Sequence, residues 1–180
     1  MKLIATLALF TFFSTSLIWK TNIEEAKTEA AKNNKVILVN FSGSDWCSPC
    51  IMLKKKIFES EDFTTYATSN LVLVNADFPR QKKHTLSNEQ KKLNDDLAAK
   101  YNPEGNFPFT LLLTANGRVI KSWDGLPDLT SAQFVDQVKQ SLNVSRCTGN
   151  PGFTRAYYAS WAIVLRSLLL QKIVTWQVFT

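Results

Sequence analysis

The strongest constraint on the fold is a nearly continuous apolar run at residues 36–41, with the sequence Val-Ile-Leu-Val-Asn-Phe. A strand without polar alternation is typical of a sheet that is covered by helices on both faces. A second run of this kind occupies residues 71–74. Because parallel strands are joined by a crossover that is usually a helix, the two runs predict an α/β fold with a parallel pair at its centre.

Helix and hairpin signals around these strands set the order of the other elements. The N-caps of three helices are predicted at Thr21 or Asn22, at Ser87 and at Thr130, each with Glu or Gln three residues downstream. Asn116 and Gly117 separate two apolar stretches and predict a β-hairpin, since both residues tolerate the positive φ of a tight turn. The order helix, strand, helix, strand, helix, hairpin and helix predicts a three-layer α/β/α sandwich with a central mixed sheet.

The composition narrows the class of protein. Of 180 residues, 45% are hydrophobic and 20% are charged, which suits one compact domain and argues against a disordered chain. The formal net charge of +6 is spread along the sequence and does not indicate nucleic-acid binding. We expect no nucleotide cofactor, because the chain has no Gly-rich dinucleotide motif. A single His argues against a His-rich metal site.

The N-terminus has the pattern of an export signal. Lys2 precedes an apolar stretch at residues 3–13, and the small residues 14–16 follow it. This pattern predicts a signal peptide at residues 1–16 and an exported protein. The alternative is an uncleaved membrane anchor, because residues 17–19 extend the apolar stretch towards the length of a membrane span.

Residues 148–180 are predicted to form a tail that is separate from the domain at residues 17–147. A Thr-Gly-Asn-Pro-Gly cluster at residues 148–152 interrupts the preceding helical pattern. Arg166 and Lys172 argue against a transmembrane helix in the apolar tail. An amphipathic helix that lies on the domain or on a membrane surface is predicted instead, from the spacing of Leu165, Leu168, Leu169, Lys172 and Trp176. The sequence assigns no function to this tail.

Cys47 and Cys50 carry the chemistry that the sequence predicts. Two residues separate them, where the first strand gives way to a helix that runs to about Phe58. Free N–H groups and the positive end of a helix favour an anion, so we expect an exposed Cys47 sulfur that ionises more readily than a free cysteine. Pro49 suits the first turn of a helix, and Trp46 provides an apolar platform beside the pair. An ionisable thiol with a resolving partner is what thiol–disulfide exchange requires.

Other interpretations of this cysteine pair remain open from the residues alone. The pair is half of a zinc site if Cys147 and His84 complete the ligand set. It is a purely structural disulfide if nothing reacts with it, or part of a redox fold that has kept only a binding function. A metallochaperone that holds a soft ion between the two thiolates is a further alternative.

The chain resembles the thioredoxin superfamily in a combination of motifs. The motifs that carry the resemblance are Val39-Asn40-Phe41, Trp46-Cys47-Ser48-Pro49-Cys50, and Phe107-Pro108 ahead of the Asn-Gly hairpin. More narrowly, residues 41–47 and the Asp-Phe-Pro-Arg segment at residues 77–80 are similar to those of secreted bacterial thioredoxin-like proteins. The resemblance extends from about Trp19 to Leu142.

The resemblance implies a thioredoxin fold and dithiol–disulfide oxidoreductase activity. In the family pattern, Cys47 is the attacking thiol, Cys50 is the resolving thiol and Pro108 is a cis-proline beside them. A cis Phe107–Pro108 bond would turn the backbone of Phe107 towards the sulfurs, where it can pair with an extended substrate. Trp46, Phe107 and Pro108 are therefore the predicted substrate-binding residues.

Polar residues around the motif receive separate predictions. Asn40 stands where many thioredoxins have a buried Asp that shuttles the proton of the resolving thiol, and Asn is not a base. Asp45 either disfavours the Cys47 thiolate through its negative charge or is a turn residue. The basic segment after the second strand is predicted to be a solvated loop and not an anion site; its residues are Arg80, Lys82, Lys83 and His84.

The sequence therefore predicts an exported thioredoxin-like oxidoreductase that exchanges electrons with protein disulfides through Cys47 and Cys50. The resemblance to secreted bacterial proteins implies that it is located in the bacterial periplasm. We expect protein substrates, no cofactor, and a membrane electron-transfer protein that recharges the pair. The two residues between the cysteines lack the His of strongly oxidising relatives, which favours reduction. The rival from another class is a binding or assembly protein that uses the surface from Trp46 to Pro108 without turnover.

Overall fold

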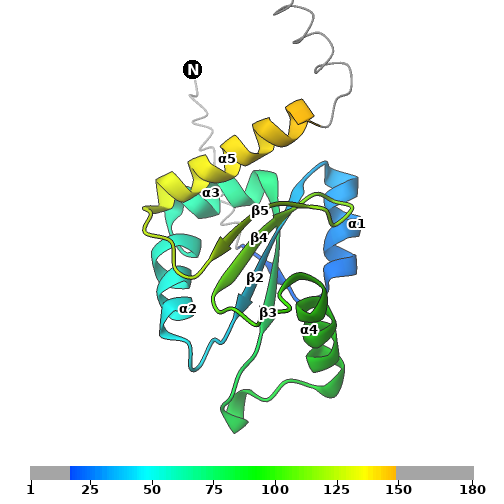
Figure 1. Ribbon diagram of the computed structural model, residues 1–180, viewed down its shortest axis with the longest axis vertical. Coiled ribbons are helices and arrows are strands. Elements are labelled where there is room, and N and C mark those ends of the chain that lie inside the picture. The colour runs from blue at the N-terminus through cyan, green and yellow to red at the C-terminus, as the bar shows by residue number, and fades with distance from the viewer. Residues whose placement is uncertain (1–16, 149–180) are drawn as a thin grey trace, which may run out of the picture. The chain divides into compact units, whose positions relative to one another are not determined.

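A computed structural model describes residues 17–148, and its centre is a five-stranded sheet (Figure 1). The strands lie in the order β1-β3-β2-β4-β5. Their bounds are β1 Trp19–Lys20, β2 Val36–Ser42, β3 Leu71–Asp77, β4 Phe109–Leu113 and β5 Val119–Asp124. Strands β1 and β2 run parallel to β3, whereas β4 is antiparallel to β2 and to β5. The predicted mixed sheet is confirmed.

Helical segments connect these strands. Their bounds are α1 Ile23–Asn33, α2 Ser48–Leu53, η1 Lys54–Phe58, α3 Glu61–Asn70, η2 Lys82–His84, α4 Asn88–Tyr101 and α5 Ser131–Thr148. Helix α2 continues directly into the π-helical segment η1, so the helical stretch ends at Phe58, as predicted. Segment η2 is a short 3₁₀ turn in the loop between β3 and α4.

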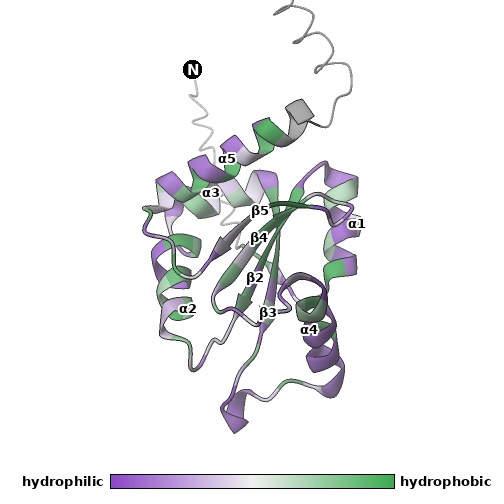
Figure 2. Ribbon diagram, viewed as in Figure 1, coloured by the Kyte–Doolittle hydropathy of each residue, from purple (hydrophilic) through white to green (hydrophobic). Residues whose placement is uncertain are grey.

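Helices cover both faces of the sheet (Figure 1). Helices α1 and α4 lie on one face, where Ala26, Ala30 and Leu97 pack with apolar residues of β2, β3 and β4. Helices α2 and α3 lie on the other face, and their Leu53 and Phe63 are buried. Figure 2 shows the apolar residues concentrated in the strands and the polar ones on the helices. The predicted three-layer α/β/α sandwich is confirmed.

The predicted helix starts are confirmed at α1 and α4. The Asn22 side chain accepts a hydrogen bond from the Glu24 N–H at 2.9 Å, and Ser87 Oγ accepts one from the Gln90 N–H at 3.1 Å. Each side chain gives a partner to an N–H group that has none within its helix. The predicted hairpin joins β4 to β5, and Gly117 adopts the positive φ, 84°, that its turn requires.

Strand β1 and helix α3 were not predicted. Helix α3 begins after Ser60, whose Oγ accepts a hydrogen bond from the Phe63 N–H at 3.3 Å, with Glu61 and Asp62 in its first turn. This pattern is typical of a helix start. However, α3 runs directly into β3, so no turn signal separates the two elements. Strand β1 is 2 residues long, which is too short for its periodicity to be detected.

Helix α5 belongs to the second of two compact units, which divide after Ser131. Its Phe134 and Val138 are fully buried. No helix among the described residues has both the length and the apolar character needed to cross a membrane. The predicted signal peptide at residues 1–16 lies outside the described residues, and so does the predicted tail at residues 148–180 except for Thr148, which is the last residue of α5.

Candidate active site

The two predicted redox cysteines meet at the start of α2. Strand β2 ends at Ser42, a short turn follows, and Cys47 is the N-cap residue of α2. Cys47 and Cys50 are joined by a disulfide with a Cα–Cα distance of 5.3 Å. The Cys47 sulfur also accepts the N–H of Cys50 at 3.3 Å, and Pro49 lies in the first turn, where it costs the helix no hydrogen bond. The predicted pairing is confirmed.

The exposure of the disulfide differs from the prediction. Cys47 is only 5% exposed and Cys50 only 4%, so the prediction of an exposed Cys47 sulfur is wrong for the disulfide-bonded form. In the turn before α2, the Cys47 N–H donates to the Gly43 carbonyl at 2.9 Å. Ser48 and Pro49, between the two cysteines, are exposed. A substrate therefore reaches the sulfurs from a restricted direction.

Trp46 is held in one orientation against this turn. Its Nε1–H donates to the Phe78 carbonyl at 2.7 Å, and its ring meets the Phe107 ring edge-on at a centroid distance of 5.6 Å. Gly43 lies so close that a Cβ at its position would stand 2.3 Å from an indole carbon. Only glycine fits there. The predicted platform is thus positioned by contacts that the motif does not reveal.

Pro108 lies at the entry to β4, beside the end of β2. The Phe107–Pro108 peptide bond is cis, as the family resemblance implied. Phe109 of β4 stands opposite Phe41 of β2, and the Pro108 carbonyl accepts the N–H of Gly125 at 2.9 Å. Because β2 leads into the cysteine turn, this register brings Pro108 to the same edge of the sheet as the disulfide.

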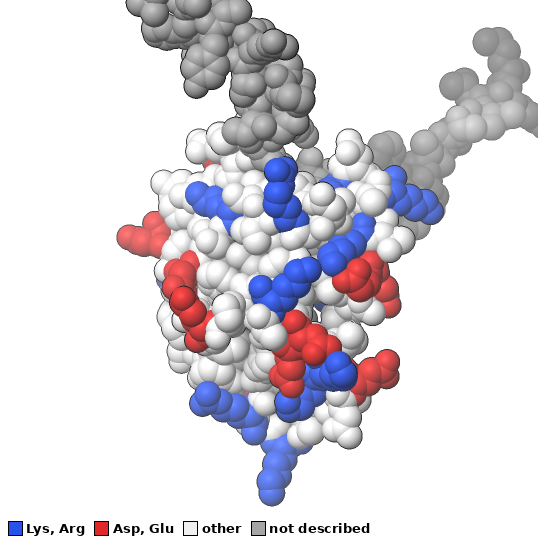
Figure 3. All heavy atoms as spheres, turned by 45° about the vertical axis from the view of Figure 1, so that its right-hand side comes forward, with Lys and Arg blue, Asp and Glu red and all other residues white. Residues whose placement is uncertain are grey.

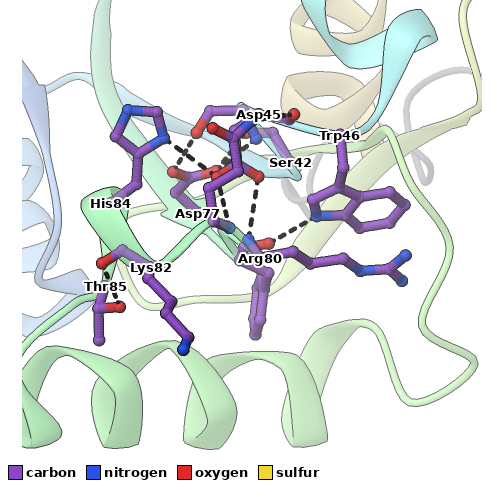
Figure 4. A network of polar contacts seen from close by, with 11 residues as sticks. Ser42, Asp45, Trp46, Asp77, Arg80, Lys82, His84 and Thr85 are labelled. Carbon is purple, nitrogen blue, oxygen red and sulfur yellow. Dashed lines mark hydrogen bonds and ion pairs between the residues drawn. The ribbon is translucent and has the colours of Figure 1, made fainter.

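Asp45 fastens the cysteine turn to the loop between β3 and α4 (Figure 4). Its carboxylate accepts the backbone N–H groups of Arg80 and Gln81, both at 2.9 Å, and lies 3.0 Å from Nδ1 of His84. The Arg80 N–H and then these other donors hold the pKa of Asp45 below its ordinary 3.8, against the opposing effect of burial. Of the two roles predicted for Asp45, the contacts support that of a turn residue.

Asp77, the last residue of β3, is a second anchor for the same turn. Its carboxylate accepts hydrogen bonds from Ser42 Oγ at 3.2 Å, from the Ser44 N–H at 2.8 Å and from Ser44 Oγ at 2.6 Å. Neither Asp77 nor Ser44 has a role that was predicted from the sequence. The available signal was an Asp that follows a buried strand, since the carboxyl ends of parallel strands meet at one edge of a sheet.

Asn40 and Asn75 form a polar pair on the face of the sheet that carries α2. Asn40 Nδ2 donates to Asn75 Oδ1 at 3.1 Å, and Asn40 Oδ1 accepts from Thr110 Oγ1 at 3.3 Å. Asn40, Asn75 and Cys50 line one cavity of about 370 Å³. The position at which many thioredoxins have a carboxylate is therefore filled by a hydrogen-bonded amide, which is not a base.

The zinc alternative named two further ligands, His84 and Cys147. The described residues contain no group of three or more His, Cys, Asp or Glu side chains that could hold a metal ion. His84 is paired with Asp45 at 3.0 Å. The side chain of Cys147 lies outside the part of the chain that the structure describes.

Comparisons with known proteins identify the family. A family model described as thioredoxin-like matches residues 18–115, more than half of the chain. The chain belongs to the thioredoxin-like family. Among curated relatives, the disulfide bond reductase DsbH of Chlamydia pneumoniae is 33% identical over 129 residues, which are 72% of this chain and 75% of that protein. A solved structure described as DsbH oxidoreductase has a TM-score of 0.66 and 27% identity, and the match covers 79% of this chain and 95% of that one.

A more distant structure supports the fold alone. The solution structure of a thioredoxin from Thermus thermophilus has a TM-score of 0.56 at 17% identity, with 75% of this thioredoxin-like chain and 94% of that chain covered. The predicted family and fold are confirmed. The prediction of a disulfide oxidoreductase is confirmed as well, by the family and the DsbH relative together with the disulfide between Cys47 and Cys50.

Proposed function

We propose that this thioredoxin-like protein is exported and reduces disulfides of other proteins through Cys47 and Cys50. The observation that carries the proposal is the position of Cys47 as the N-cap of α2, with its sulfur on the N–H of Cys50 at 3.3 Å. N–H groups at a helix start stabilise an anion, and the thiolate is the form of cysteine that attacks a disulfide. Cys50 is placed to bond with the same sulfur.

The reaction consists of two exchanges. In the reduced protein, the Cys47 thiolate attacks one sulfur of the substrate disulfide and forms a mixed disulfide. The other substrate sulfur leaves as a thiolate and takes up a proton. Cys50 then loses its proton and attacks the Cys47 sulfur, which forms the Cys47–Cys50 disulfide and releases the second substrate thiolate. Two electrons pass to the substrate, and the cysteine pair is oxidised.

The proposed substrate-binding site is formed by Trp46, Phe107 and Pro108. Within residues 17–148, neither the N–H nor the C=O of Phe107 takes part in a hydrogen bond, whereas its ring packs against Trp46 and Phe78. An extended segment beside Phe107 gains main-chain hydrogen bonds of the kind that add a strand to a sheet. This feature favours a polypeptide substrate over a small disulfide.

The cavity of about 370 Å³ is the proposed route for the proton of Cys50. A water molecule takes up about 30 Å³ of liquid volume, so the cavity has room for several. Asn40 lines the same cavity and can hydrogen-bond to water, but an amide does not accept a proton at neutral pH. Water therefore takes the proton that the buried Asp of many thioredoxins accepts.

The direction of electron flow and the localisation have separate supports. The DsbH relative bears the name disulfide bond reductase, and the two residues between the cysteines include no His. Both observations favour reduction. The export pattern at residues 1–16 favours the periplasm. A reductase in that compartment needs a source of electrons, which we propose to be a membrane electron-transfer protein.

Reduction of insulin disulfides by the purified protein, with dithiothreitol as the electron source, tests this function. Cys47→Ala is expected to lower the rate to that of dithiothreitol alone, because the attacking sulfur is gone. Cys147→Ala removes a cysteine outside the pair and is expected to retain the wild-type rate. Full activity of Cys47→Ala contradicts the proposal.

A second variant separates turnover from binding. Cys50→Ala keeps the attacking sulfur and removes the resolving one, so mixed disulfides with substrate proteins accumulate on Cys47. They are detected as adducts that dithiothreitol releases. Partners that bind Cys50→Ala without any such adduct indicate the binding or assembly protein instead. One soft metal ion retained per reduced wild-type chain indicates the metallochaperone.

A further inference from the structure

The loop between β3 and α4 places a cationic surface next to the active-site tryptophan. The side chains of Arg80, Lys82 and Lys83, here called the basic rim, are exposed. Figure 1 shows this loop at the lower end of the sheet, where the chain passes from β2 to α2. Figure 3 shows Lys and Arg side chains that protrude at this end of the molecule. The sequence predicts only a solvated loop here.

Contacts with Asp45 fix the position of the basic rim relative to Cys47. Besides the two backbone N–H groups that the carboxylate accepts, the Gln81 side chain donates to the Asp45 carbonyl at 3.0 Å. The Asp45 side chain is 2% exposed and stands two residues before Cys47. These contacts hold the loop, and the charges it carries, in a fixed position relative to Asp45 and the cysteine turn. A solvated loop without such contacts would not have a fixed position.

Arg80 is the residue of the basic rim that lies next to the proposed substrate-binding site. Its guanidinium carbon lies 3.6 Å from the centroid of the Trp46 ring, and Figure 4 shows the side chain extended along the indole. Stacking occupies the face of a guanidinium and leaves N–H donors at its edge. Within residues 17–148, no carboxylate forms an ion pair with Arg80, Lys82 or Lys83. These groups are available to a bound molecule.

Two carboxylates next to the cysteine turn, Asp45 and Asp77, are directed towards the protein. Asp45 accepts hydrogen bonds from the loop, and Asp77 accepts them from Ser42 and Ser44 of the cysteine turn. Their oxygens are occupied by internal donors, whereas the cations of the basic rim are exposed. A segment that approaches along the Arg80 side of Trp46 therefore meets positive charge, whereas the exposed carboxylates of Glu104 and Asp124 lie by Asn106, next to Phe107.

We propose that the basic rim binds acidic side chains that flank the reactive disulfide of a substrate protein. This inference rests on the proposed reductase function and adds a chemical class of substrate. The planar guanidinium of Arg80 matches a carboxylate of a segment that lies along Trp46. Lys82 and Lys83 attract anionic segments over a longer range. The effect falls on the rate of association more than on the exchange step.

Three disulfide peptides of equal length test the proposal. They carry Asp and Glu, Ser, or Lys next to the disulfide and are otherwise identical. The full-length protein is reduced beforehand, and its Trp fluorescence gives the second-order rate constant for each peptide. At low salt the acidic peptide is expected to react about 10-fold faster than the Ser peptide. Because salt screens exposed charges, this advantage is expected to disappear at high salt.

Charge variants locate the effect on the basic rim. The double variant Lys82→Gln, Lys83→Gln is expected to lower the acidic-to-Ser rate ratio several-fold, and Arg80→Gln is expected to lower it as well. The double lysine variant leaves Arg80 on Trp46, so it tests the proposal even where Arg80→Gln disturbs the indole. The matched control is Lys32→Gln, Lys92→Gln, which removes the same charge from exposed positions of α1 and α4 and is expected to keep the ratio.

Two outcomes contradict the proposal in distinguishable ways. Equal rates for the three peptides, or a ratio that the double lysine variant preserves, overturn the charge selection and leave the reductase function intact. Failure to reduce any of the three peptides overturns the reductase function and this inference with it.

Discussion

Strand β2 faces two different surroundings on its two sides. Ile37, Val39 and Phe41 are fully buried in an apolar cluster with residues of α1 and α4. The alternate residues point to the opposite face, as the pleat of a strand requires. On that face, Asn40 and Ser42 line the cavity beside the disulfide. One strand thus supplies part of the apolar core and, at its C-terminal end, the polar lining of the active site.

The two faces of β2 are stabilised in different ways. The apolar face gains its stability from the removal of hydrocarbon surface from water. The polar face must satisfy its own hydrogen bonds, because a buried polar group without a partner costs about 1–3 kcal/mol. No buried side-chain N or O atom among the described residues lacks a partner. Asn40 is tolerated beside the reactive cysteines because Asn75 and Thr110 complement it.

Phe41→Ala gives the largest expected loss of stability. The side chain is fully buried and lies 6.2 Å from the Phe109 ring, so its removal leaves a cavity in the apolar cluster. We expect the free energy of unfolding in urea to fall by about 3–5 kcal/mol. Insulin reduction per folded molecule is expected to stay close to wild type. A loss below about 1 kcal/mol would show that this face is not the main source of stability.

Asn40→Ala is expected to have an intermediate effect. It leaves Asn75 and Thr110 without their partner, which lowers the free energy of unfolding by about 1–3 kcal/mol. It also changes the lining of the cavity beside Cys50, so the mixed disulfide on Cys47 is expected to resolve more slowly. Stopped-flow measurement of the second exchange step detects this delay. A stability loss equal to that of Phe41→Ala, with unchanged resolution, contradicts the functional difference between the faces.

Asp45→Asn is expected to have the smallest effect, and one that depends on pH. The pKa of Asp45 is lowered in the folded state, chiefly by the Arg80 N–H, so the charged carboxylate stabilises the fold at pH values above about 3.8. This contribution is lost as the pH falls through the lower folded-state pKa. The wild type is therefore expected to be more stable than Asp45→Asn at neutral pH, and the gap is expected to close below about pH 3.8.

Urea unfolding at a series of pH values measures that gap. Glu104→Gln removes an exposed carboxylate elsewhere and serves as the control. A gap between wild type and Asp45→Asn that stays constant from neutral to acid pH shows that the Asp45 carboxylate does not hold the loop.

Sequence patterns were sufficient where the interacting residues are close along the chain. The caps at Asn22 and Ser87 lie within three residues of their partners, and Cys47 and Cys50 lie one helical turn apart. In these cases local backbone geometry determines the contact. The cis Phe107–Pro108 bond was predicted from the family resemblance and not from local rules.

Patterns failed where burial or distant pairing determines the result. Neither the low exposure of Cys47 nor the closeness of Gly43 to Trp46 is revealed by local propensity. Helix α3 has a sound N-cap at Ser60 but no separating turn before β3. Residues that act through distant partners, such as Asp77, carry no signal that distinguishes them from any other Asp after a strand.

The chain's own pattern of residues determined the α/β class, the mixed sheet and the cysteine pair, because each depends on periodicity or on neighbours within a few residues. The residues that surround the cysteine pair are brought there by the tertiary structure. Asp45 contacts Arg80, 35 residues away, because the parallel register of β2 and β3 brings the loops that follow them to one end of the sheet. Trp46 contacts Phe107 because β4 pairs with β2 and begins at the same end. Register is a property of packed strands, so the loops it joins and the charge they present to a substrate appear only in three dimensions.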